Sequence, residues 1–467
     1  MSRLTQPGLA AVLLLGVVAI AGTEPQIEDP FRVVEQLDGL AEKQLWPGFD
    51  PRKYPVAIYD GNRTWLFRHP QPPEQEFTRS ERDTEVWFHQ GRHPAMRSNS
   101  KASIGGVTTG TLLLTIRPGR SAREEASILI HETFHIFQDA RYPRWTANEA
   151  HRFTYPVADL ANYLATILED NALARALETE DVESTAGWAA RAMELRARRR
   201  SRLAPEHREF ELGLEMMEGT AFYVAHLALN ESESTDRLLD VLPPERFRWR
   251  PYATGGAIAA LLDRLTPGWK TSVGQSADTT LEQLLRNCLE ASETPPAEFS
   301  ETELRGFGQR AEAAIAELVA ERKARRSVFE NRQVWRVIVD VAAGVDRFHL
   351  DQFDPINMRS LGQGDLLHGH RLTLTHPAGQ VRMANPRFVR REFVGLNALS
   401  SVAEGHRLLA ACREVVFTGF ADVPQADSVD GRITVRADGL ELDLEPATVT
   451  RTGKTIRVTV GASTPRI

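Results

Sequence analysis

His131-Glu132-Thr133-Phe134-His135 is the stretch that constrains the fold and the chemistry of this chain most. It reads H-E-x-x-H and lies in a segment whose pattern predicts one helix. Residues four apart on a helix share a face, so both imidazoles point the same way, with a carboxylate beside the first. Two neutral imidazoles and one further protein ligand make a zinc site with an open coordination position. The middle carboxylate, Glu132, is then placed to take a proton from zinc-bound water.

The residues around this motif predict a capped and buried helix. Ser121 and Glu124 have the spacing of a capping box, which marks the start of a helix. The segment that follows is apolar nearly all round, as in a helix enclosed by protein. Its apolar residues are Ala126, Ile128, Leu129, Ile130, Phe134, Ile136 and Phe137. Buried imidazoles cost several kcal/mol unless they are paired or bound to metal. The alternative is that His131 and His135 are core histidines satisfied by ordinary hydrogen bonds.

Length and composition are those of a soluble globular protein with two or three domains. The chain has 467 residues, of which 42% are hydrophobic and 25% are charged. Its net charge of −7 and isoelectric point near 6.1 give no reason to expect nucleic-acid binding.

The N-terminus has the features of a signal peptide. Arg3 precedes an apolar run from Leu9 to Ile20, and the sequence up to Ala21 fits the small-residue cleavage rule. We therefore expect residues 1–21 to be removed. The apolar run is too short for a transmembrane helix, and no other stretch predicts one. The mature chain is expected to be secreted or periplasmic, without a transmembrane segment.

The pattern of apolar residues predicts an α+β fold in two parts. The first, 22–330, begins with an amphipathic helix near Phe31 to Glu42. A hairpin around Asp60-Gly61, a short strand at 86–88 and strands at 103–107 and 111–116 are expected between it and the motif helix. Helices follow it, and they are expected at 157–178, 182–203, 206–229, 253–265, 279–291 and 301–329. Near Val334 the period changes from 3.6 to 2. Strands are then expected at 334–341, 371–376, 380–383, 414–417, 432–436, 440–444 and 455–460, in a β-rich C-terminal domain over 331–467.

Two histidines need a third ligand, and Glu218 is the best candidate. It begins the sequence E-G-T-A-F-Y inside a predicted helix, and Gly219 beside it lets a second helix approach closely. Glu169, on the preceding helix, and Glu149, in the loop after the motif helix, are competing candidates. Glu215 lies one turn before Glu218 and could hydrogen-bond the ligands.

A tyrosine near the start of a later helix is a candidate oxyanion donor. Tyr252 lies in the sequence P-Y-A-T-G-G, which leads into the helix predicted at 253–265. Near zinc, its hydroxyl would hydrogen-bond the oxyanion of a tetrahedral intermediate. The alternative is a tyrosine that only packs against its neighbours.

These three segments together resemble the gluzincin peptidases. The E-G-x-A segment is similar to those of the aminopeptidase N group and the bacterial collagenases, and P-Y-x-x-G is similar to the aminopeptidase N stretch whose tyrosine stabilises the transition state. By that resemblance His131, His135 and Glu218 match the ligands of one Zn²⁺, Glu132 the general base and Tyr252 the oxyanion donor.

The resemblance covers roughly residues 85–265 and implies a zincin-like catalytic domain, with a small mixed sheet and a mostly helical part. The strand at 111–116 resembles the edge strand along which zincins bind an extended peptide. The expected function is therefore an exported zinc metallopeptidase that acts on a peptide or protein substrate. The alternative is a catalytically weak or inactive protein of this fold that binds a peptide or cell-envelope ligand.

Four further groups of residues have simpler interpretations. An arginine-rich run comprises Arg196, Arg198, Arg199, Arg200 and Arg202. It predicts a solvated helix face whose arginines pair with nearby Glu. The alternative is a site that binds an anion. A histidine-rich patch predicts exposed side chains on a loop and strand rather than a second metal site; it comprises Asp365, His368, His370 and His376. His89 and His93 are expected on a surface loop. Cys288 and Cys412 are either joined in a disulfide or remain separate thiols.

Overall fold

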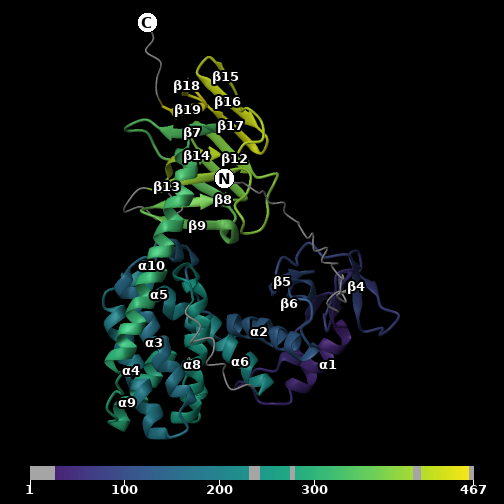
Figure 1. Ribbon diagram of the computed structural model, residues 1–467. Coiled ribbons are helices and arrows are strands. Elements are labelled where there is room, and N and C mark those ends of the chain that lie inside the picture. The colour runs from purple at the N-terminus through teal and green to yellow at the C-terminus, as the bar shows by residue number, and fades with distance from the viewer. Residues whose placement is uncertain (1–26, 231–241, 274–278, 403–411, 462–467) are drawn as a thin grey trace, which may run out of the picture. The chain divides into compact units, whose positions relative to one another are not determined.

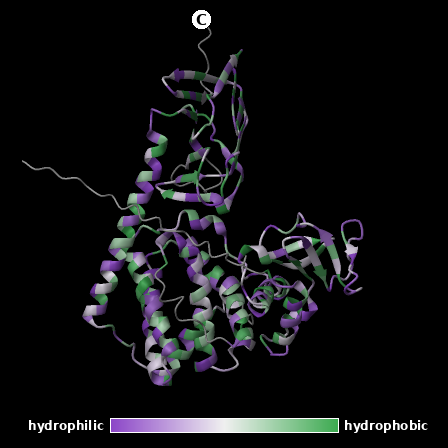
Figure 2. Cartoon of the chain, turned by 45° about the vertical axis from the view of Figure 1, so that its right-hand side comes forward, coloured by the Kyte–Doolittle hydropathy of each residue, from purple (hydrophilic) through white to green (hydrophobic). Residues whose placement is uncertain are grey.

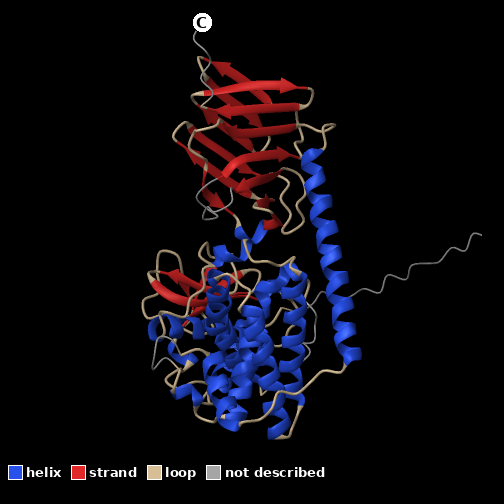
Figure 3. Cartoon of the chain, turned by 90° about the vertical axis from the view of Figure 1, so that its left-hand side faces the viewer, coloured by secondary structure: helices blue, strands red, loops and turns tan. Residues whose placement is uncertain are grey.

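A computed structural model describes residues 27–230, 242–273, 279–402 and 412–461 (Figure 1). The predicted signal peptide lies outside these ranges. The described residues form a mixed α and β fold with three sheets and a β-rich C-terminal region (Figure 3). None of the described helices combines the length and apolarity that crossing a membrane requires.

The chain divides into two compact units. Unit 1 comprises Met1–Gln44 and Asp50–Ile136, and unit 2 comprises Leu45–Phe49 and Phe137–Ile467. The boundary falls inside the helix that carries the H-E-x-x-H motif. The domain limit near residue 330 expected from the sequence stays a prediction.

Unit 1 holds α1 (Pro30–Leu40), the motif helix up to Ile136 and a mixed six-stranded sheet with the order β3-β4-β2-β1-β6-β5. Its strands are β1 (Val56–Tyr59), β2 (Arg63–Phe67), β3 (Thr78–Arg79), β4 (Trp87–Gln90), β5 (Ser100–Ile104) and β6 (Val107–Leu113). The predicted hairpin is confirmed: β1 and β2 are antiparallel, and the Asp60 carboxylate accepts the backbone N–H groups of Asn62 and Arg63 across the turn. Only β1 and β6 run parallel within this sheet.

The strand before the motif helix differs from the prediction. The strand ends at Leu113, and Leu114–Ile116 form a 3₁₀ turn instead of continuing it. Gly105 and Gly106, with φ of +54° and +81°, make the turn between β5 and β6, so the strand predicted at 103–107 is split. The prediction of an edge strand here is wrong, because β6 pairs with β1 on one side and β5 on the other.

The motif helix is α2 (Ala122–Arg141). Its predicted capping box is confirmed: Ser121 N–H donates to Glu124 Oε2 at 2.8 Å, and Glu124 N–H donates to Ser121 Oγ at 3.3 Å. Thr133 packs against β6 at Gly110, where an added Cβ would lie 3.1 Å from the Thr133 methyl group. The helix therefore lies close against the sheet of unit 1.

Helices make up the first part of unit 2, as the sequence predicted. They are α3 (Leu160–Glu178), α4 (Val182–Arg200), α5 (Pro205–Leu214), α6 (Thr220–Leu229), α8 (Arg250–Leu265), α9 (Leu281–Ser292) and α10 (Glu301–Glu330). The helix predicted at 206–229 is interrupted, because a π-helical turn, Glu215–Gly219, separates α5 from α6. Green and purple bands alternate along the long helix α10 in Figure 2. Its buried residues, Phe307, Ala311, Leu318 and Phe329, follow one helical stripe.

The C-terminal region consists of two sheets around one apolar core. Their orders are β18-β19-β7-β14-β13-β10-β9 and β15-β16-β17-β12-β11-β8. The strands are β7 (Arg336–Val341), β8 (His349–Phe353), β9 (Met358–Gly362), β10 (Asp365–His368), β11 (Arg371–His376), β12 (Gly379–Ala384), β13 (Asn397–Val402), β14 (Cys412–Thr418), β15 (Gln425–Val429), β16 (Arg432–Ala437), β17 (Leu440–Leu444), β18 (Ala447–Thr452) and β19 (Thr455–Val460). Val337 and Phe417 of one sheet share a core with Leu374 and Leu442 of the other. All seven predicted strands are present.

Both cysteines are free thiols in the structure. Cys288 is half-buried and Cys412 is buried. Burial raises the pKa of the Cys412 thiol to about 12. Of the two alternatives left open by the sequence, the structure therefore has separate thiols.

Candidate metal centre

His131 and His135 lie one turn apart on α2 with their rings turned toward each other. The two Nε2 atoms are 3.0 Å apart, and the ring planes meet at 88°. Both side chains are half-buried. Two nitrogen ligands of a tetrahedral zinc ion, each about 2.0–2.1 Å from the metal, would be about 3.3 Å apart. The spacing of the imidazoles is thus close to that of two ligands on one ion.

Glu218 lies in the π-helical turn of unit 2. Single π turns insert one residue into a helix and are frequent at functional sites. One ligand atom each from His131, His135 and Glu218 lies within 4.8 Å of the others. Throughout the described ranges, this is the only cluster of three such side chains with that spacing. These are the three side chains that the sequence suggested as ligands, and two imidazoles with one carboxylate suit zinc.

Gln138 connects the motif helix to this π turn. Its Nε2 donates to the carbonyl oxygen of Met217 at 2.9 Å and to Thr220 Oγ1 at 2.8 Å. The side chain is 2% exposed. Gln138 follows His135 by three residues and therefore lies on the same face of α2 as both histidines. Its hydrogen bonds attach the C-terminal end of α2 to the turn that contains Glu218. Gln138 was not predicted as part of the site. The only feature of the sequence that indicates it is its position three residues after His135, on the same helix face.

Two glycines allow α8 to cross the π turn. A Cβ added at Gly219 would lie 2.7 Å from the Gly255 Cα, and one added at Gly255 would lie 2.8 Å from the Glu215 carbonyl oxygen. Both distances are shorter than any tolerable contact, so the two backbones touch. The sequence predicted such an approach at Gly219, and the helix that makes it is α8, which carries Tyr252.

Replacing Gly255 with alanine is expected to destabilise the protein by about 1–3 kcal/mol, because the new methyl group must displace backbone. The same shift should move Glu218 and lower the zinc content of the purified protein. Gly306→Ala in α10 is the control, since an added Cβ there meets nothing within 4 Å. Urea denaturation and metal analysis of both variants test this. Equal stability and equal zinc content would contradict the proposed crossing.

Tyr252 lies beside Glu218, where Arg248 also reaches. Arg248 Nη1 donates to the Tyr252 hydroxyl at 3.2 Å, and its Nη2 lies 3.7 Å from Glu218 Oε1. Burial raises the pKa of Tyr252. The charge of Glu218 and the hydrogen bond between Tyr252 and Glu218 raise this pKa further, whereas Arg248 lowers it. The hydroxyl is therefore held as a neutral donor close to one candidate ligand. Arg248 belongs to this group of residues and was not foreseen from the sequence.

No family model matches the sequence. Neither a curated protein nor a solved structure matches the chain. The interpretation of the site accordingly depends on the arrangement of its own residues.

The competing ligand candidates are held by arginines. Glu149 Oε1 accepts from Arg248 Nη2 at 2.5 Å. Glu169 is completely buried and accepts from Arg196 Nε at 2.7 Å. Glu215, expected near the ligands, accepts both Nη groups of Arg196 at 2.9 and 2.6 Å. Of the four carboxylates considered from the sequence, Glu218 is the one grouped with the two histidines.

The arginine-rich run is mostly buried, so the prediction of a solvated helix face is wrong. Arg196, Arg199 and Arg200 are 0%, 2% and 6% exposed. Their spacing places them on one inward face of α4. Their carboxylate partners come from other helices and are Glu169, Glu211, Glu215 and Glu282. The expected pairing with glutamates is therefore confirmed, while solvation applies only to Arg198 and Arg202.

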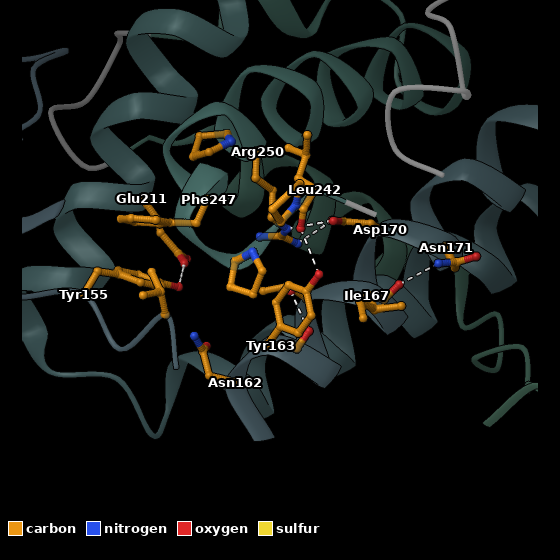
Figure 4. A pocket seen from close by; sticks show the side chains of 15 residues that line it. Tyr155, Asn162, Tyr163, Ile167, Asp170, Asn171, Glu211, Leu242, Phe247 and Arg250 are labelled. Carbon is orange, nitrogen blue, oxygen red and sulfur yellow. Dashed lines mark hydrogen bonds and ion pairs between the residues drawn. The ribbon is translucent and has the colours of Figure 1, made fainter. Parts of the chain in front are cut away.

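A narrow cavity of about 40 Å³ lies beside this buried network (Figure 4). The rings of Tyr155, Tyr163 and Phe247 form part of its wall, together with the ion pair of Arg250 and Asp170 at 2.6 Å. Burial raises the pKa of Asp170 to about 6 although Arg250 opposes this. Such a volume holds a few water molecules. The candidate zinc ligands are not among the lining residues, so we do not assign this cavity to the metal site.

The other histidines have local partners. His93 is buried, and its Nε2 lies 2.7 Å from Glu76 Oε2. The prediction of a surface-loop residue is therefore wrong for His93. His89 lies in β4. His368 is also buried, 2.9 Å from Ser400 Oγ, so the prediction of an exposed side chain is wrong for it. Burial lowers its pKa to about 3. His370 pairs separately with a nearby aspartate. In the part of the chain that the structure describes, no second metal-binding group occurs.

Proposed function

We propose that this chain is an exported zinc metallopeptidase. The observation that supports the proposal is the convergence of His131, His135 and Glu218 within 4.8 Å. Zinc bound by these side chains would lower the pKa of a water molecule and polarise a peptide carbonyl group at the open position. Export follows from the signal peptide predicted at residues 1–21, so the substrates are peptides or proteins outside the cytoplasm.

The remaining steps belong to the side chains of the chain itself. Glu132, which is 8% exposed and next to His131, takes a proton from the attacking water. As the C–O bond forms, Tyr252 donates a hydrogen bond to the carbonyl oxygen that gains negative charge. The C–N bond then breaks, and Glu132 passes the proton to the leaving amine. Hydrolysis therefore consumes one water and, after the second proton of that water also passes to the amine, yields a carboxylate and an ammonium group.

Metal analysis of the purified mature chain tests this proposal. We expect close to one zinc per chain, loss of zinc in His135→Ala, and unchanged zinc in His349→Ala, which alters an exposed histidine of β8. A zinc chelator should stop the hydrolysis of a peptide library, and added zinc should restore it. Wild-type protein without zinc would count against the proposal and favour the inactive, peptide-binding alternative.

A further inference from the structure

Two arginines beside the candidate zinc site hold a carboxylate of the chain itself. Glu149 accepts from Arg248 Nε at 2.9 and 3.0 Å and from its Nη2 at 2.5 Å. Arg152 Nη1 lies 3.8 Å from the other oxygen of Glu149. Burial lowers the pKa of Arg152 and the nearby Arg248 lowers it further, while Glu149 opposes both effects. The two guanidinium groups thus form a cradle around one carboxylate, and Arg152 also donates to the carbonyl oxygen of Pro355.

The carboxylate in this cradle is easy to exchange. The side chain of Glu149 is 40% exposed, whereas those of Arg248 and Arg152 are 22% and 20% exposed. Glu149 begins a short 3₁₀ turn, Glu149–Phe153, which has no buried residue. Because water already reaches this carboxylate, a substrate carboxylate that takes its place exchanges one charge-assisted pair for another. The arginines would stay in place because Arg248 is also bonded to Tyr252.

The cradle lies next to the residues proposed to act on the scissile bond. Arg248 contacts the Tyr252 hydroxyl at 3.2 Å and approaches Glu218 to 3.7 Å. An extended peptide advances by at most about 3.3–3.6 Å per residue. A carboxylate bound to Arg248 would therefore belong to a residue within about three positions of the bond that is cleaved.

We propose that Arg248, assisted by Arg152, binds the free C-terminal carboxylate of the peptide substrate in exchange for Glu149, so that the protein removes residues from C-terminal ends. The planar fork of a guanidinium group matches a carboxylate with two parallel hydrogen bonds. Arg196, Arg199 and Arg200 cannot serve this purpose, since their charges are buried in other pairs. This inference rests on the zinc peptidase proposed above.

Calorimetric titration of the zinc-loaded mature chain tests the inference. The Glu132→Gln variant serves as the parent, so that binding is measured without turnover. The probes are N-acetyl-trialanine as the free acid, the same peptide as the C-terminal amide, and an amide with aspartate at the central position. We expect the free acid to bind at least about tenfold more tightly than either amide, as a charge-assisted pair of hydrogen bonds requires.

Three further substitutions in this parent, with a fourth as control, distinguish the cradle from a general effect of charge. Arg248→Met should remove the preference for the acid, and Arg248→Lys should keep only part of it. Glu149→Gln should tighten acid binding, because it removes the competing carboxylate. Arg198→Met, at an exposed position of α4, is the matched control and should change nothing. The Glu149→Gln result also keeps the test decisive if Arg248→Met does not fold.

Equal binding of acid and amide, no measurable binding of the acid, or a preference that survives Arg248→Met would overturn the inference. Tight binding of the aspartate amide would overturn the assignment to the C-terminus and indicate an acidic side chain instead. Zinc content and cleavage of longer peptides, offered both as free acids and as amides to the wild-type chain, report on the proposed function separately. A zinc-containing, active protein without acid preference would reject only the carboxylate site.

Discussion

Replacing Glu132 with glutamine is expected to lower kcat for peptide hydrolysis by about 10²–10⁴-fold while zinc stays bound. Glutamine has nearly the same shape as glutamate but cannot take a proton from water. The candidate ligands are His131, His135 and Glu218, so the substitution leaves the metal-binding groups intact. Steady-state hydrolysis of a peptide library, with zinc measured on the same sample, checks both parts of this expectation.

Glu125 provides a matched control for this substitution. It is a buried glutamate on the same helix, two turns earlier, and burial raises its pKa to about 7. Because it is partly protonated near neutral pH, Glu125→Gln is expected to change activity and stability little. Full activity in Glu132→Gln would remove Glu132 from the mechanism. Loss of zinc in that variant would instead show that the carboxylate supports the metal site.

The parts of the fold that could be predicted are those encoded by local spacing. The capping box of Ser121 and Glu124 marked the start of α2, and the apolar period placed α3, α4 and α8–α10 within a few residues of their ends. The spacing of His131 and His135 depends only on helix geometry, so it too followed from the sequence.

The missed strands lacked the alternation of polar and apolar residues on which the prediction depended. β15 (Gln425–Val429) is exposed along its whole length, and β8 buries only Leu350. Six strands of the C-terminal region were missed, namely β8, β9, β10, β13, β15 and β18. Pairing with neighbouring strands forms them, and such pairing is a tertiary property. The same reason explains the mistaken edge position of β6, which only the pairing with β5 reveals.

The parts of the site that could not be predicted are those whose partners lie far away in the sequence. Gln138 binds residues of the π turn some 80 positions later, and nothing near Gln138 indicates that turn. Arg248 is paired with Glu149 from an earlier loop. The arginines of α4 were interpreted as solvated because charged residues usually are. Their burial depends on carboxylates that three other helices and the π turn supply.

Replacing Arg196 with methionine is expected to destabilise the protein by about 3–5 kcal/mol, the usual cost of leaving a buried charge without its partner. The Arg196 side chain is 0% exposed and is paired with Glu169 and Glu215. Methionine fills a similar space but leaves both carboxylates short of a cation. Urea denaturation at neutral pH measures the loss. Arg198→Met is the control, because Arg198 is 69% exposed and should contribute about 0–1 kcal/mol.

The loss should shrink in acid, which separates the charge effect from a packing effect. Burial raises the pKa of Glu169 and of Glu215. Arg196 is the largest influence in the other direction, and both pKa values lie below the usual range. Carboxylates of lowered pKa stabilise the folded chain fully above their unfolded pKa of about 4.3, and this contribution is lost as the pH falls through the folded values. Wild type should therefore lose more stability than Arg196→Met below about pH 4. Because Glu215 begins the π turn that contains Glu218, the variant should also bind zinc more weakly at neutral pH. A difference in stability that stays constant with pH would assign the role of Arg196 to packing alone.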